Sequence, residues 1–126
     1  MHERPTIVCL CGSTRFWRTF QEASLRETLA GKIVLSIGAA RAADDDDRTF
    51  GGYVPLGQWD TVKRQLDELH LRKIDLADEV LVLNVEGYIG ESTLRELRYA
   101  IAQGKPLRWW EQESVAEIIA CIGQSA

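Results

Sequence analysis

The fold of this chain is decided by residues 80–96, VLVLNVEGYIGESTLRE. The apolar run 80–85 has the length and composition of a fully buried strand, and a turn with two glycines follows it. A helical pattern then opens near Ser92, so that Glu91 and Glu96 fall at the beginning of one helix. A helix that begins directly after a buried strand presents free backbone N–H groups to a ligand. The stretch therefore predicts a ligand site with two carboxylates beside it.

The rest of the sequence alternates strand patterns with helical patterns. Strand patterns occur at 6–11, 32–37, 80–85 and 106–110. Helical patterns occur at 16–30, 59–76, 92–103 and 114–122, and the last begins with a capping-box sequence at 114–117. This order predicts an α/β three-layer sandwich with a parallel sheet of four strands, or five, in the Rossmann-like, flavodoxin-like order 2-1-3-4. The first and third strands are then neighbours, and the turns that follow them should face one another across a cleft.

Length, composition and charge limit the class of protein. The chain has 126 residues, which fits a single domain over 1–126. It is 45% hydrophobic and 27% charged, as an ordinary globular protein is. A net charge of −4 argues against a nucleic-acid polymer as partner, and no apolar run is long enough to predict a membrane span. The first residues lack a signal-peptide layout, so a cytoplasmic protein is expected.

Three cysteines without framework spacing predict reduced thiols. Cys9 and Cys11 stand two apart in a strand pattern and should share one face. A zinc site needs more ligands than these two thiols and two distant histidines, His2 and His70. We therefore favour buried structural thiols and expect neither a metal nor a cofactor.

Residues 38–57 form a long irregular segment that contains four consecutive acids, 44–47. A segment of this length in a compact domain is usually functional or mobile. For the acid run, a solvated loop tip is favoured over a cation site.

The turn after the first strand combines Gly12, Ser13, Thr14 and Arg15. Two hydroxyl groups and a guanidinium at a helix N-terminus suit an anion such as phosphate. The alternative is that Ser13 only caps the helix and Arg15 is a surface charge. Neither a Walker loop nor a G-x-G-x-x-G motif is present, which favours a mononucleotide over a dinucleotide.

Glu96 flanks the core face of its helix, which is formed by Leu94, Leu97 and Ile101, and should look along the wall of the cleft. The alternative is an exposed carboxylate that only stabilises the helix dipole, and this applies more strongly to Glu91. Both functions of Glu96 are compatible with its position in the sequence.

Three motifs resemble the nucleoside 2-deoxyribosyltransferase-like superfamily, which includes nucleoside 5′-monophosphate N-glycosidases. They are CGSTR at 11–15, ADEV at 77–80 and TLRELRYA at 93–100. The resemblance covers about residues 6 to 110, and the order and spacing of the motifs make it more specific than any single motif.

The resemblance implies that Glu96 is the nucleophile at the anomeric carbon and that Ser13 and Arg15 bind the 5′-phosphate. Asp78 is the second candidate catalytic residue, although it can also simply cap the third strand. The superfamily places a further acid on the helix before that strand. His70 falls near this place, between Asp67 and Asp75, so the general acid remains open.

The two facing turns supply the candidate substrate-binding residues. Tyr88 can stack on a base or only cover the end of the sheet. The candidate substrate- and phosphate-binding residues are Gly12, Ser13, Arg15, Tyr88, Gly90 and Ser92.

The function expected from this resemblance is cleavage or exchange of the N-glycosidic bond of a (deoxy)nucleoside 5′-monophosphate or nucleoside. A hydrolase and a transferase need the same glutamate, so both remain open. Members of the superfamily self-associate, and a homodimer or a higher homo-oligomer is expected. The alternatives are a non-catalytic nucleotide-binding or sensing module on the same fold and an interaction domain that uses Trp109 and Trp110.

Overall fold

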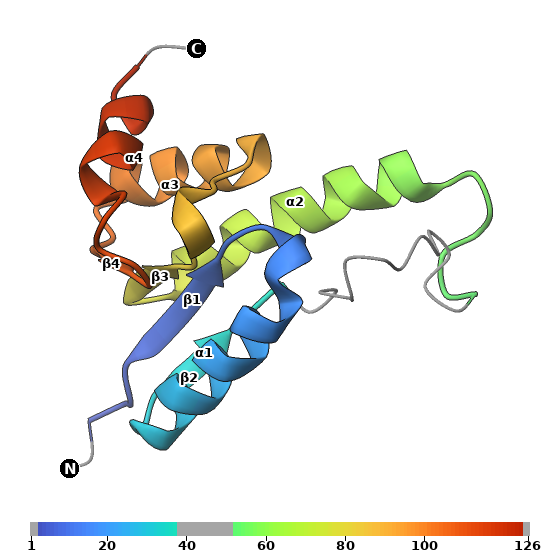
Figure 1. Ribbon diagram of the computed structural model, residues 1–126. Helices are drawn as coiled ribbons and strands as arrows, with labels where there is room; N and C mark the ends of the chain where they lie inside the picture. Colours follow the sequence, from blue (N-terminus) through green and yellow to red (C-terminus); the bar gives the residue numbers. More distant parts are fainter. Residues whose placement is uncertain (1–2, 38–51, 125–126) are drawn as a thin grey trace.

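The computed structural model describes residues 3–37 and 52–124, and Figure 1 shows them as an open α/β sheet with helices on both faces. The described strands all run parallel in one sheet, in the order β2-β1-β3-β4. They are β1 (Ile7–Cys11), β2 (Ile33–Leu35), β3 (Glu79–Val82) and β4 (Leu107–Trp109). The predicted strand order is confirmed, and four strands lie in the described part. The acid run 44–47 lies outside the described residues.

The helices divide between the two faces of the sheet. They are α1 (Trp17–Leu29), α2 (Trp59–Leu76), α3 (Glu91–Ala102) and α4 (Val115–Ile122), with short 3₁₀ turns η1 (Thr14–Phe16) and η2 (Val85–Gly87). Helix α1 covers one face, whereas α2, α3 and α4 cover the other (Figure 1). This is the predicted three-layer sandwich.

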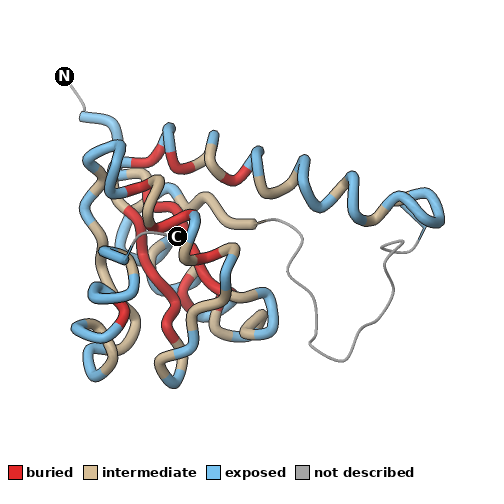
Figure 2. The backbone as a smooth tube through the Cα atoms, turned by 90° about the horizontal axis from the view of Figure 1, so that it is seen from above, coloured by how far each residue is buried: buried red, intermediate tan, exposed pale blue. Residues whose placement is uncertain are grey.

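The alternation of side chains along β1 divides the core into two parts. Val8 and Leu10 point towards α1 and pack with Phe20, while Cys9 and Cys11 point towards the layer of α2 and α3. All four strand residues are fully buried. Figure 2 shows this buried core in red at the centre of the molecule.

Helix α2 extends past the sheet, and its amino-terminal part projects beyond the sheet and the other helices (Figures 1 and 2). Its buried residues, His70 and Ile74, lie in the carboxyl-terminal half. No helix in the described ranges is long and apolar enough to cross a membrane.

Strand β3 ends at Val82, earlier than the predicted residue 85, because Asn84 has partners outside the sheet. The Asn84 side chain is fully buried and donates to the carbonyl oxygen of Glu111 at 2.7 Å and to Oγ of Ser114 at 3.0 Å. Its amide oxygen accepts from the Glu111 N–H at 3.0 Å. Ser114 makes no side-chain hydrogen bond to α4, so the predicted capping box is wrong.

Ion pairs occupy the edge of the sheet where the strands begin. Lys32 Nζ lies 2.8 Å and Arg108 Nη2 lies 3.0 Å from Oε1 of Glu79 at the start of β3. Just before this strand, Arg4 pairs with Asp78 at 2.8 Å. The opposite edge, where the strands end, carries the two glycine turns.

We predict that Gly12→Ala destabilises the fold, because β1 and the residues after β3 approach closely at this point. A methyl group on Gly12 would lie 3.0 Å from Cβ and 3.2 Å from the carbonyl oxygen of Leu83. Overpacking of this kind lowers the free energy of unfolding by about 1–3 kcal/mol, measurable by urea denaturation.

Gly123→Ala is the matched control for this measurement. Gly123 has helical φ and ψ, and a methyl group there would lie 3.7 Å from its nearest neighbour. The control should raise the free energy of unfolding slightly, by no more than about 1 kcal/mol. Equal effects of the two substitutions would contradict the close approach at Gly12.

Candidate functional site

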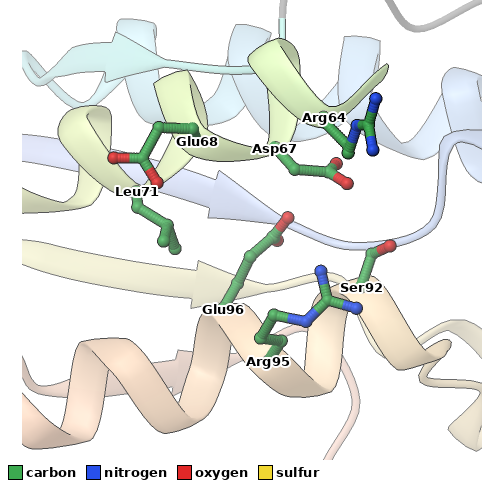
Figure 3. A pocket seen from close by; sticks show the side chains of 7 residues that line it. All are labelled: Arg64, Asp67, Glu68, Leu71, Ser92, Arg95 and Glu96. Carbon is green, nitrogen blue, oxygen red and sulfur yellow. The ribbon is translucent and has the colours of Figure 1, made fainter. Parts of the chain in front are cut away.

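Glu96 lies on the inner side of α3 and is buried, with 7% of its surface exposed. Its neighbour Leu97 is fully buried and anchors the same face of the helix in the core. Figure 3 shows the Glu96 side chain extending from α3 towards α2. Between the two helices it lines a pocket of about 190 Å³, which we call the α2–α3 pocket. The lining residues are Arg64, Asp67, Glu68, Leu71, Ser92, Arg95 and Glu96.

Burial raises the pKa of Glu96 to about 7. The charges of Cys9 and Asp67 act in the same direction, whereas His70 and a hydrogen bond with Cys11 lower the pKa. The Glu96 carboxyl group therefore gains and loses its proton much closer to neutrality than an exposed glutamate does. Perturbed pKa values of this kind are frequent at functional sites, and Glu96 is not an ordinary surface charge.

Behind Glu96 lies a buried group of side chains that we call the Cys–His–Glu cluster: Cys9, Cys11, His70 and Glu96. His70 of α2 is 2% exposed, and its Nε2 lies 3.4 Å from Sγ of Cys11 and 3.7 Å from Sγ of Cys9. The same nitrogen lies 3.7 Å from Oε1 of Glu96. In the described part of the chain, Nδ1 of His70 has no hydrogen-bond partner.

The thiols and the imidazole influence one another's protonation. The hydrogen bond with Cys11 lowers the pKa of the Cys9 thiol, and the same contact raises the pKa of Cys11. Burial opposes the charged form of His70, but its contacts with Cys9 and Glu96 raise the pKa of the imidazole overall. The protonation of each of these groups therefore depends on that of its neighbours.

The sequence prediction that Cys9 and Cys11 share a face is correct, but the description of His70 as distant is wrong. His70 stands four residues after Leu66 and four before Ile74, so it lies in the same helical row as these two residues. This row faces the sheet, and Ile74 is fully buried. The row was the signal in the sequence that could have placed His70 on the buried side of α2.

The two glycine turns meet at the carboxyl edge of the sheet, as predicted from the strand order. The guanidinium carbon of Arg15 lies 4.1 Å from the centre of the Tyr88 ring, and Phe16 contacts the same ring edge-on. Ser13 caps η1 by accepting a hydrogen bond from the N–H of Arg15 at 3.3 Å. Ser13 therefore caps the helical turn, which was the alternative to phosphate binding. Arg15 stacks on Tyr88 of the opposite turn.

The N-terminus of α3 has donors to offer a ligand. Gly90 is its N-cap residue, and no side chain of the described residues caps this end of the helix. Ser92, in the first turn, accepts a hydrogen bond from Lys63 Nζ at 3.4 Å and also lines the α2–α3 pocket. Free N–H groups, a hydroxyl group and a nearby cation form a suitable environment for an anion.

Asp78 is not brought together with Glu96. It lies just before β3, at the amino edge of the sheet, and accepts hydrogen bonds from Arg4 at 2.8 and 2.9 Å and from the Ile7 N–H at 2.8 Å. The Arg4 guanidinium holds the pKa of Asp78 well below its usual range. Asp78 thus caps the strand edge, which was the alternative function, and we leave it out of the candidate site.

Five residues of the α2–α3 pocket are absent from the predicted catalytic and substrate-binding residues: Arg64, Asp67, Glu68, Leu71 and Arg95. Both arginines are exposed and have no ion-pair partner among the described residues. They belong to solvent-facing helical positions, which in sequence resemble any charged helix surface.

Cys9, Cys11 and His70 are also the residues that could hold a metal ion. Their ligand atoms all lie within 4.8 Å of one another, and all three residues are buried. Thiolate and imidazole ligands suit a soft divalent cation.

Comparison of the chain with protein-family models, with curated proteins and with solved structures gives no match. The fold defines the class of protein: it is an α/β protein with a parallel sheet in the order 2-1-3-4 and polar side chains at the carboxyl edge of that sheet.

We predict that Asp78→Asn lowers thermal stability in a pH-dependent way. A carboxyl group whose pKa is lowered by folding stabilises the protein above its unfolded pKa of about 3.9, and this contribution is lost as the pH falls towards the folded value. The variant should therefore unfold at a lower temperature than the wild type at pH 7. The difference should close as the pH falls below about 4.

Glu113→Gln is the control, because Glu113 is exposed and has no partner in the described ranges. Thermal unfolding followed by circular dichroism from neutral to strongly acidic pH gives the comparison. A gap between wild type and Asp78→Asn that stays constant with pH would exclude the ion pair with Arg4 as its cause.

Proposed function

We propose that this protein cleaves or exchanges the N-glycosidic bond of a (deoxy)nucleoside 5′-monophosphate, or of a nucleoside, with Glu96 as the nucleophile. The observation that carries the proposal is the position of Glu96: a buried carboxylate that lines a pocket next to the N-terminus of α3. The resemblance of the motifs around Gly12 and Glu96 to nucleoside 2-deoxyribosyltransferase-like enzymes supports the same reaction.

The spacing along α3 suits a nucleotide. Glu91 begins the helix and Glu96 follows five residues later, which is ~7.5 Å along the helix axis. A 5′-phosphate bound by the free N–H groups, Ser92 and Arg15 would therefore leave the sugar beside Glu96. The pocket, at about 190 Å³, is smaller than the roughly 300–1,000 Å³ of sites that enclose a whole ligand. The sugar would fill it, and the base would extend towards the mouth.

In the proposed reaction, an oxygen of Glu96 attacks C1′, and the bond from C1′ to the base nitrogen breaks. The electron pair of that bond leaves with the base, which takes up a proton. Asp67 of α2 lines the same pocket and is our candidate for assisting the departing base. Water then hydrolyses the glycosyl-enzyme, or a second base replaces the first.

We also propose that the protein is cytoplasmic, uses no cofactor and self-associates. These three properties are consistent with the resemblance. Size-exclusion chromatography with light scattering measures the oligomeric state directly.

We predict that Glu96→Gln abolishes release of free base from deoxynucleoside monophosphates, by roughly 10³-fold or more. The amide keeps the shape of the side chain but is not a nucleophile. Glu91→Gln makes the same change of charge at an exposed position on the same helix and should keep activity close to the wild type. Chromatography of the free base measures both variants, and activity in Glu96→Gln would refute the assignment.

We predict that Arg15→Ala weakens the use of monophosphates more than the use of nucleosides. Loss of one charge-assisted hydrogen bond to phosphate corresponds to roughly tenfold to hundredfold in kcat/KM. Arg18→Ala is the control, since Arg18 is exposed on α1 and stacks on Trp17 instead. Equal losses on both substrate types would show that Arg15 does not bind the phosphate.

The second candidate is a non-catalytic nucleotide-binding or sensing module. It is favoured by one observation: the uncapped end of α3 and the stacked pair of Arg15 and Tyr88 form an anion site that does not need Glu96. This function predicts a rise in the unfolding temperature on addition of nucleoside monophosphates, with no release of base.

A further inference from the structure

We propose that the Cys–His–Glu cluster is a binding site for one zinc ion, held by Cys9, Cys11 and His70. The first two ligands come from β1 and the third from α2. An ion at this point would join the sheet to helix α2.

The separations of the ligand atoms suit a tetrahedral ion. Zn–S bonds of about 2.3 Å and Zn–N bonds of about 2.0–2.1 Å place sulfur and nitrogen about 3.6 Å apart around one zinc ion. Nε2 of His70 lies 3.4 Å from Sγ of Cys11 and 3.7 Å from Sγ of Cys9. All three ligand atoms lie within 4.8 Å of one another, close enough to converge on one ion.

The contacts of the thiols with His70 are weak hydrogen bonds, at 3.4 and 3.7 Å. Buried polar groups with weak partners gain little from them. A bound cation would give both thiols and Nε2 of His70 a stronger common partner.

The donor set selects the kind of ion. Two thiolates and one imidazole favour zinc over the hard cations Mg²⁺ and Ca²⁺, which prefer oxygen ligands. Cys9 and Cys11 are fully buried, and Glu96 is the one member of the cluster that lines the α2–α3 pocket. Three protein ligands leave the fourth tetrahedral position to a water molecule or another small ligand. Binding releases the protons of both thiols.

An ion on these three ligands would lie near Glu96, whose Oε1 is 3.7 Å from Nε2 of His70, and its charge would attract the carboxylate that the proposed reaction needs as a nucleophile. This consequence rests on the proposed function, but the binding of zinc does not. Metal-loaded protein should then release less base than metal-free protein.

The test is the metal content and the cobalt spectrum of the full chain. After dialysis against metal-free buffer and addition of Zn²⁺, we expect one equivalent of zinc per chain by plasma mass spectrometry. Co²⁺ in place of zinc should give sulfur-to-cobalt charge-transfer bands and the intense visible bands of a tetrahedral site. Absence of these bands in the wild-type protein overturns the proposal, whether or not any variant folds.

Cys9→Ala and Cys11→Ala keep a small apolar side chain in the core and remove one ligand each. Loss of a group that only supports a metal ligand weakens metal binding by roughly 10–100-fold. Loss of a ligand itself, as in either of these variants, should weaken zinc binding by more than that. Cys121→Ser is the matched control, because Cys121 is the exposed third cysteine. Zinc binding that depends on Cys121 as strongly as on Cys9 and Cys11 would place the ion elsewhere and overturn the proposal.

Discussion

Two thiols, an imidazole and a carboxyl group are buried together where β1 meets α2 and α3, and the position of the candidate site depends on this contact. Each polar side chain is brought there by the regular repeat of its own element: alternate positions on β1 and the inward-facing rows of the two helices. Removing such groups from water is costly unless they find partners. The packing of the core, not the conformation of a surface loop, therefore holds Glu96 in place.

The two edges of the sheet carry different kinds of polar group. At the amino edge, the charges of Arg4, Lys32 and Arg108 are paired with carboxylates and stabilise the strand starts. At the carboxyl edge, α3 begins without a side-chain cap among the described residues, and Arg15 stacks on Tyr88. Ligands of open α/β sheets bind at the carboxyl edge. The division of charges between the edges agrees with that rule and separates Asp78 from Glu96.

The strand order could be predicted because apolar runs and helical repeats are local properties of the sequence. The end of β3 could not, since Asn84 stops the strand through partners 27 and 30 residues away. The ion pair that keeps Asp78 away from the site could not be predicted either, because its partner Arg4 lies 74 residues away in the sequence. His70 lies on an apolar helical row, yet nothing local indicates that the row would cross β1 at Cys9, 61 residues earlier. The pairs of polar side chains that are far apart in the sequence could thus be identified only from the structure.

We propose that a nucleotide lies along α3 with its anomeric carbon facing the side chain of Glu96. A crystal structure of the Glu96→Gln protein with a deoxynucleoside 5′-monophosphate can show this arrangement, because the variant should bind the nucleotide without cleaving it. We expect the phosphate at the N-terminus of α3 beside Ser92 and Arg15, and C1′ in the α2–α3 pocket in contact with the amide that replaces the carboxyl group. A nucleotide bound with its sugar outside this pocket would refute the proposed position of Glu96 at the sugar.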